Sequence, residues 1–220
     1  MNNKPIILFD LDGTVIDSTE AILESFHNSF RHYNVKAPSD EAIKALIGHP
    51  LDEMYRSFGI AEDKVWDYVH TYKEYYRKIA CQKTVLLEHA REAIELASSF
   101  ARLGIVTTKT GKYSQEIMEH FGLMLYFETL IGREHVENPK PHKEPVEKAL
   151  KAMSVSKDNV WLIGDTQMDI YCAKNAGIEH IAVTSGYESE EEIRKHTQCV
   201  VENVFQAVVR IEKLNRNSEV

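Results

Sequence analysis

The stretch Phe9-Asp10-Leu11-Asp12-Gly13-Thr14 is where the fold of this 220-residue chain can be predicted first. It follows the apolar run 5–9, which is typical of a buried strand. Asp10 and Asp12 stand two positions apart where that strand should end, and this spacing puts both carboxylates on one side of the backbone. Two like charges this close are costly unless one carboxyl keeps its proton or a cation such as Mg²⁺ joins them. Taken alone, the stretch is equally compatible with a tight polar turn at Gly13.

Two kinds of pattern follow this first strand. Apolar positions at a helical period, with no strand signal between Val15 and Cys81, predict helices at about 19–33, 39–47, 51–58 and 61–80. After Leu86, short apolar runs alternate with helical patterns. They predict strands at 103–107, 129–131, 160–163 and 180–183, and helices at about 89–102, 113–121, 143–153, 168–175 and 203–214.

Strands that alternate with helices imply a parallel α/β sheet, whose ligands bind outside the carboxyl ends of the strands. We therefore expect an α/β core formed by residues 1–15 and 85–220. An all-helical cap, residues 16–84, is inserted after the first strand. Its two connections, near 14–18 and 81–86, come close to the end of that strand, so a hinged lid over the site is the natural arrangement.

Composition and charge exclude several classes of protein. The chain is 43% hydrophobic and 27% charged, with a formal net charge of −8. These values describe an ordinary globular protein and argue against non-specific binding to nucleic acid or to anionic membranes. No apolar run has the length of a membrane span or a signal peptide. The isolated Cys81, Cys172 and Cys199 are typical of reduced thiols, so we expect a cytoplasmic protein. The sequence leaves its oligomeric state open between a monomer and a homodimer.

Polar clusters follow three later predicted strands, at 107–109, 138–141 and 164–169. In a parallel sheet they share an edge with Asp10. Each also has an ordinary structural interpretation: Thr107 could cap a turn, and Lys140 could be a solvated lysine, although prolines on both sides restrict its backbone. Asp169 could form a capping box with the threonine three residues earlier. Asp165 directly follows a buried strand, and with the two earlier aspartates it would complete a hard-cation site.

The joint order of these motifs is more specific than any one of them. D-x-D-G-T is followed by a threonine, then a lysine, then G-D-x-x-x-D, each at a predicted strand end. In this order the chain resembles the haloacid dehalogenase superfamily over nearly its whole length. The helical block resembles the cap of the phosphoglycolate phosphatase-like branch, whose cap loop is similar to residues 48–51. The resemblance implies a Rossmann-like core with a central parallel sheet and an inserted all-helical cap.

The resemblance also implies roles for the four aspartates. Family members use the first aspartate, here Asp10, to attack phosphorus and form an aspartyl-phosphate. The second, here Asp12, protonates the leaving oxygen and then activates the attacking water. Mg²⁺ would bind Asp10, the backbone carbonyl of Asp12 and Asp165. Asp169 would be a further metal ligand or would support the ligands from behind.

The remaining motifs are implied to hold the phosphoryl group and the substrate. Thr107 and Lys140 would bind the phosphoryl oxygens, together with backbone N–H groups near Leu11 and at Thr108. Substrate choice should lie in the cap, where His49 is a candidate to meet a substrate anion. A role in the turn that links two helices is at least as compatible with His49. Arg56 is a second candidate in the cap, although the pattern favours a solvated or packing role for it.

These implications favour a Mg²⁺-dependent phosphatase of small phosphorylated metabolites, with 2-phosphoglycolate as the leading substrate. Relatives that dehalogenate lack the second aspartate, which this chain has as Asp12. One alternative is an inorganic pyrophosphatase of very similar layout. A second alternative, from another class, is a catalytically silent protein that senses a phosphorylated metabolite.

Overall fold

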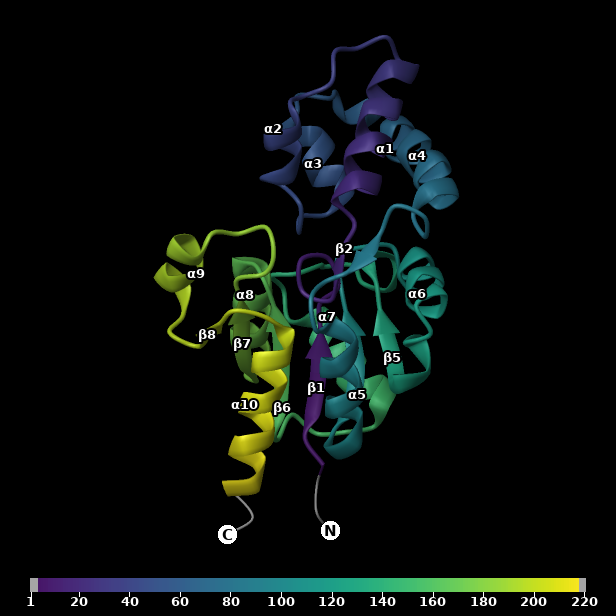
Figure 1. The fold of residues 1–220 in the computed structure, drawn as a ribbon. Helices are drawn as coiled ribbons and strands as arrows, with labels where there is room; N and C mark the ends of the chain where they lie inside the picture. The colour runs from purple at the N-terminus through teal and green to yellow at the C-terminus, as the bar shows by residue number, and fades with distance from the viewer. Residues whose placement is uncertain (1–3, 218–220) are drawn as a thin grey trace.

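A six-stranded parallel sheet forms the centre of the computed structural model, which describes residues 4–217 (Figure 1). The strand order is β5-β4-β1-β6-β7-β8, and every neighbouring pair is parallel. The strands are β1 Ile6–Phe9, β4 Arg102–Val106, β5 Phe127–Ile131, β6 Val160–Gly164, β7 Glu179–Val183 and β8 Val200–Val201. The predicted parallel α/β core is confirmed.

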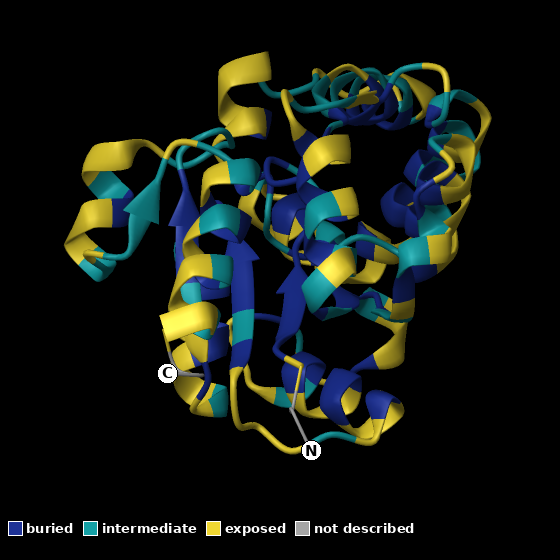
Figure 2. Ribbon diagram, turned by 60° about the horizontal axis from the view of Figure 1, so that its bottom comes forward, coloured by how far each residue is buried: buried dark blue, intermediate teal, exposed yellow. Residues whose placement is uncertain are grey.

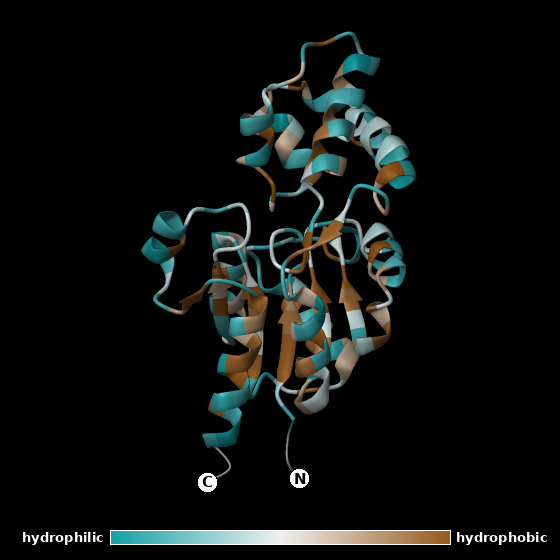
Figure 3. Ribbon diagram, viewed as in Figure 1, coloured by the Kyte–Doolittle hydropathy of each residue, from teal (hydrophilic) through white to brown (hydrophobic). Residues whose placement is uncertain are grey.

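Helices cover both faces of the sheet, because the central strand β1 is apolar on both sides. Ile7 and Phe9 pack on one face with α5 (Ala90–Phe100) and α10 (Val204–Asn217). Ile6 and Leu8 point to the other face and pack with α7 (Glu144–Met153) and α8 (Gln167–Ala176). Figure 2 shows the buried strands between helices whose outer surfaces are exposed, and Figure 3 shows the same strands as the most hydrophobic part of the fold.

Four further helices stand over the carboxyl ends of the strands (Figure 1). They are α1 (Thr19–His32), α2 (Asp40–Lys44), α3 (Leu51–Ser57) and α4 (Glu62–Ile79). Their own core is aromatic: the ring centroid of Phe26 lies 4.8 Å from that of Tyr55, and the ring centroid of Phe30 lies 5.3 Å from that of Tyr68. Such ring pairs add to the free energy gained by burying the rings, which lets a small helical block hold together.

A short antiparallel ribbon joins the helical block to the sheet layer. It consists of β2 (Ile16–Asp17) and β3 (Val85–Leu86). The prediction that no strand lies between Val15 and Cys81 is therefore wrong at β2. Two residues are too few to show a period of two, so the sequence pattern contains no sign of this strand.

Smaller differences concern the polar periphery. Helix α6 (Gly111–His120) begins two residues before the predicted start, and α9 (Glu190–His196) and β8 were not predicted. Two 3₁₀ turns flank β5, at Met124–Tyr126 and Arg133–His135. Ser39 caps α2, because its side chain accepts a hydrogen bond from the N–H of Ala42. Within residues 4–217, no helix combines the length and apolar character needed to cross a membrane.

Candidate active site

Four predicted site residues meet at the carboxyl edge of the sheet. Asp10 follows β1, Thr107 follows β4, Lys140 lies in the loop after β5, and Asp165 follows β6. The register aligns these ends, since Phe9 stands beside Ile105 on one side and Ile163 on the other. All four side chains are buried. The structure thus brings these residues together, as the motif order predicted.

Lys140 joins two of the aspartates. Its ammonium nitrogen lies 3.0 Å from Oδ1 of Asp10 and 2.6 Å from Oδ1 of Asp169. Burial alone would lower the pKa of Lys140, but the two carboxylates raise its pKa overall. The lysine is only 2% exposed and keeps its charge, so the alternative of a solvated lysine is wrong.

The carboxylates at this edge carry more negative charge than Lys140 balances. Carboxylate oxygens of Asp10, Asp165 and Asp169 lie within 4.8 Å of one another. Burial raises the pKa of Asp10 to about 6 against the opposing effect of Lys140, and burial followed by the neighbouring Asp10 raises that of Asp165 well above its ordinary value. Oδ1 of Asp10 has an ion pair with Lys140 but no contact of hydrogen-bond geometry. An all-oxygen set with an unsatisfied buried atom fits a hard divalent cation.

Asp165 sits in a pocket that only glycines leave open. A Cβ atom on Gly13 or on Gly186 would collide with its carboxylate, and Gly13 also has a φ of +80°. Its two oxygens accept hydrogen bonds from Oγ1 of Thr14 at 3.1 Å and from the N–H of Tyr187 at 2.9 Å. Of the two glycines that leave room for Asp165, the sequence pattern singles out only Gly13. Gly186 and Tyr187 lie after β7 in a loop without a recognisable motif.

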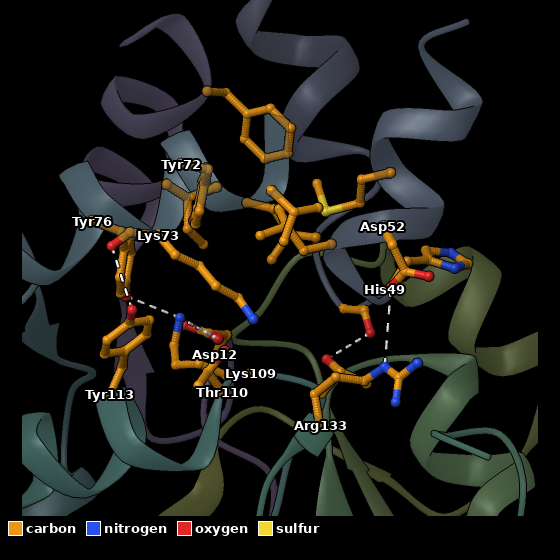
Figure 4. Close-up of a pocket in the computed structure, with 18 of the residues that line it drawn as sticks. Asp12, His49, Asp52, Tyr72, Lys73, Tyr76, Lys109, Thr110, Tyr113 and Arg133 are labelled. Carbon is orange, nitrogen blue, oxygen red and sulfur yellow. Dashed lines mark hydrogen bonds and ion pairs between the residues drawn. The ribbon is translucent and has the colours of Figure 1, made fainter. Parts of the chain in front are cut away.

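Asp12 has a different set of partners. Oδ1 accepts a hydrogen bond from the hydroxyl of Ser18, and Oδ2 lies 2.9 Å from the ammonium nitrogen of Lys109. Lys109 also donates to the hydroxyl of Tyr76 on α4, at 2.9 Å, and lies over the ring of that tyrosine (Figure 4). Lys109 belongs to the polar cluster 107–109, but no role was predicted for it. Its place in a polar cluster at a predicted strand end was the one feature of the sequence that could have marked Lys109 as a site residue.

The polar cluster 107–109 also contacts the helical block. The Thr107 hydroxyl accepts a hydrogen bond from the N–H of Lys109 at 3.2 Å, so its predicted turn-capping role is present. The Thr108 hydroxyl donates to the carbonyl of Gly48 at 2.9 Å. Leu11 is buried, and its carbonyl accepts hydrogen bonds within the turn that follows β1. The two sides of the site are thus in direct contact through the loop at Gly48.

Asp169 forms the predicted capping box with Thr166. Its Oδ2 accepts hydrogen bonds from the N–H and the hydroxyl of Thr166, at 3.2 and 2.9 Å. Its Oδ1 is the atom that contacts Lys140. Both oxygens therefore already have protein partners, and Asp169 is suited to orienting Lys140 while it adds charge to the cation site.

A cavity of about 210 Å³ lies between the helical block and the sheet edge. Asp12 and Lys109 line it from below, and His49 lines it from the loop before α3 (Figure 4). Thr108 also lines it. Arg56 is not among its lining residues. Its guanidinium group is paired with Asp52 at 2.5 Å and with Glu62 at 2.7 Å, which leaves it in a structural role.

Comparisons with known proteins agree with this arrangement. Residues 7–183 match the sequence model of a family described as haloacid dehalogenase-like hydrolase. The chain is 32% identical over 191 residues to a pyrophosphatase PpaX from Halalkalibacterium halodurans, covering 86% of this chain and 87% of that protein. It is 29% identical over 206 residues to a phosphoglycolate phosphatase from Colwellia psychrerythraea, covering 89% and 91%. A solved haloacid dehalogenase-like family hydrolase from Streptococcus pneumoniae has the same fold, with a TM-score of 0.84, 24% identity, and coverage of 96% and 99%.

Proposed function

The chain belongs to the haloacid dehalogenase-like hydrolase family, and from that premise we propose that it is a Mg²⁺-dependent phosphatase of small phosphate monoesters, with 2-phosphoglycolate as the leading substrate. One observation carries the proposal. The buried Asp10 has a lysine ammonium 3.0 Å away and lies among carboxylate oxygens within 4.8 Å of one another. Such a group is poised to attack phosphorus when cations offset the surrounding negative charge.

The two aspartates of the first motif divide the reaction between them. A carboxylate oxygen of Asp10 forms a bond to phosphorus while the bond from phosphorus to the leaving oxygen breaks. Asp12 gives its proton to that oxygen. In the second step Asp12 takes a proton from water, the water oxygen bonds to phosphorus, and the bond to Asp10 breaks to release phosphate. Ser18 and Lys109 hold the Asp12 carboxylate for both proton transfers.

The metal site belongs to the same proposal. Asp10, Asp165 and the backbone carbonyl of Asp12 would hold Mg²⁺, with Asp169 supporting them through Lys140. When bound, Mg²⁺ supplies positive charge beside the phosphoryl and carboxylate oxygens. Its removal with EDTA should abolish turnover.

The phosphoryl oxygens are assigned to Lys140 and Thr107, with the backbone N–H groups of Leu11 and Thr108. The Lys140 ammonium group is held by Asp10 and Asp169, so its position is set before substrate binds. Donors fixed in advance favour the transition state without a cost of reorganisation.

We assign residues 1–15 and 85–220 to a catalytic core and residues 16–84 to a cap that opens about hinges near 14–18 and 81–86. The contact between Thr108 and Gly48 and that between Lys109 and Tyr76 favour a closed position of the cap. A cytoplasmic monomer or homodimer that acts on small metabolites completes the proposal. His49 remains a candidate for contact with substrate, since it lines the cavity.

The decisive experiment is hydrolysis of p-nitrophenyl phosphate with Mg²⁺ by the wild type and by Asp10→Asn. We expect turnover to vanish in this variant and to persist in Asp158→Asn, which changes an exposed aspartate far from the sheet edge. Unchanged turnover in Asp10→Asn would refute the assignment of the nucleophile. A wild type inactive on a broad panel of phosphate esters would favour the silent metabolite-binding alternative.

The second candidate function is hydrolysis of inorganic pyrophosphate. The relative named pyrophosphatase PpaX favours it. Release of phosphate from pyrophosphate and from 2-phosphoglycolate, measured side by side with the same enzyme, decides between the two substrates.

A further inference from the structure

Lys73 on α4 directs its ammonium group into the cavity above Asp12 and Lys109 (Figure 4). The residue is half-buried, whereas lysines of globular proteins usually extend their charged ends to solvent. Among residues 4–217, no hydrogen bond or ion pair reaches its ammonium nitrogen. A cation aimed inward without a protein partner is suited to a ligand anion.

The other cations around the cavity already have partners. Lys109 lies 2.9 Å from Asp12, and Arg133 donates to the carbonyl of Val136 and lies 4.0 Å from Asp52. Three acidic residues, Asp12, Asp52 and Glu134, also line the cavity, but none of them pairs with the ammonium group of Lys73, which is left available for a ligand. Because Lys73 and Lys109 point toward the same space, an anion between them would relieve their repulsion.

The surroundings of Lys73 strengthen such an interaction. Trp66, Val69 and Lys73 recur at the spacing that puts them on one face of α4, and all three line the cavity. Other apolar side chains complete the wall: Ile22, Phe26, Leu51 and Met54. Apolar walls lower the local dielectric, so a charge pair formed there counts for more than one formed in water.

Resting on the proposed phosphatase function, we propose that Lys73 binds a second anionic group on the leaving-group side of the substrate. The preferred substrates then carry a second negative charge next to the phosphoryl group that is transferred. A carboxylate and a second phosphate share this chemistry. The cavity, about 210 Å³ against about 30 Å³ for one water in the liquid, has room for either.

The test uses a matched pair of substrates. One is 2-phosphoglycolate, and the other is the amide of its carboxyl group, which keeps the phosphate but lacks the carboxylate charge. We expect Lys73→Gln to lower kcat/KM for the acid by at least about tenfold, the usual value of a charged hydrogen bond, and to change that for the amide less than about twofold. Lys78→Gln is the control, since Lys78 is exposed on the same helix and does not line the cavity. Pyrophosphate forms a further arm: a selective loss there, with the glycolate unaffected, identifies the second anion as phosphate.

Equal losses on the acid and the amide would overturn the proposal, since they would indicate a role in cap packing. So would an unchanged kcat/KM for both the acid and pyrophosphate. A binding measurement separates this proposal from the proposed function. The dissociation constant of 2-phosphoglycolate for Asp10→Asn protein with Mg²⁺ should rise at least about tenfold when Lys73→Gln is added. A wild type without turnover refutes the phosphatase, whereas an unchanged dissociation constant refutes the role of Lys73.

Discussion

The ammonium group of Lys140 lies 3.0 Å from a carboxylate oxygen of Asp10, and the two residues come from loops after different strands. The pair has opposite charges, and both side chains are buried. Removal of Lys140 would leave the buried carboxylates of Asp10 and Asp169 without a compensating charge, which is far more costly than the loss of a surface pair, whereas removal of the Asp10 charge leaves Lys140 paired with Asp169.

Lys140→Gln should therefore reduce both activity and stability. We expect kcat/KM on p-nitrophenyl phosphate to fall by at least about 100-fold, because the phosphoryl oxygens lose a fixed donor. The melting temperature without metal should also fall, because Asp10 and Asp169 lose their shared cation. Lys143→Gln, at an exposed lysine paired with Glu147, is the control for both measurements. A variant with normal activity would exclude contact between Lys140 and the substrate.

The pKa of Asp10 makes the stability of the metal-free protein depend on pH. Burial raises this pKa from 3.8 to about 6, so the folded state holds the proton more tightly than the unfolded chain. The resulting stabilisation is complete below about pH 3.8 and is lost as the pH rises through about 6. In EDTA, Asp10→Asn should match the wild type near pH 4 and melt several degrees higher at pH 7.5.

Thermal melting of the wild type and Asp10→Asn between pH 4 and pH 7.5 checks whether the pKa of Asp10 is raised or lowered. Mg²⁺ at pH 7.5 should narrow the difference in melting temperature between the wild type and Asp10→Asn, because bound Mg²⁺ stabilises the ionised carboxylate of the wild type. If Asp10→Asn melts below the wild type at pH 7.5 in EDTA, the attraction of Lys140 outweighs burial, and the pKa of Asp10 is lowered rather than raised.

Mg²⁺ should raise the melting temperature of the wild type but not that of Asp165→Asn. Asp165 offers a ligand oxygen in a pocket closed around it by Gly13 and Gly186, so its loss removes a ligand that no neighbour can replace. The shift follows the metal concentration, as expected for binding to the folded state alone. Glu192→Gln is a matched control in a second acidic group on the surface, formed with Glu188 and His196. An equal loss of the Mg²⁺ effect there would mean that the metal binds at that surface cluster instead.

Lys109→Met should slow substrates with poor leaving groups more than p-nitrophenyl phosphate. Lys109 holds Asp12, whose proton matters most when the leaving oxygen is strongly basic. We expect kcat on an alkyl phosphate to fall about tenfold more than kcat on the aryl ester. Lys112→Met, at an exposed lysine of α6, should leave both values unchanged. Equal losses on both esters would indicate that Lys109 acts only through the cap residue Tyr76.

Much of the core was predictable because sequence and sheet geometry are closely linked there. The buried run of β1 has apolar side chains on both faces, and the carboxyl ends of parallel strands share an edge. A motif assigned to a strand end is thereby placed in space, which is why Asp10, Lys140 and Asp165 were expected together. The helical block was predictable for a similar reason, since its apolar positions keep a helical period.

The parts that were missed depend on contacts between distant segments. Lys109 gains its importance from Asp12 and from Tyr76 on another element. Arg56 was named as a candidate for substrate binding beside the favoured solvated or packing role, and the two acids that pair with it could not be identified from the sequence. Gly186 is required by the carboxylate that lies against it. No local pattern records such relationships.

The paired strands β2 and β3 have a consequence for how this architecture can change. The chain leaves the sheet layer through β2 and returns to it through β3, and these two strands pair with each other. The helical block between them therefore begins and ends at the same place. Insertions, deletions or a wholly different set of helices above that crossing would leave the alignment of the six strands intact. In the proposed assignment the cap selects the substrate and the core carries the chemistry, so the two functions would lie in separately replaceable stretches of the gene, and the first could diversify while the second stays constant.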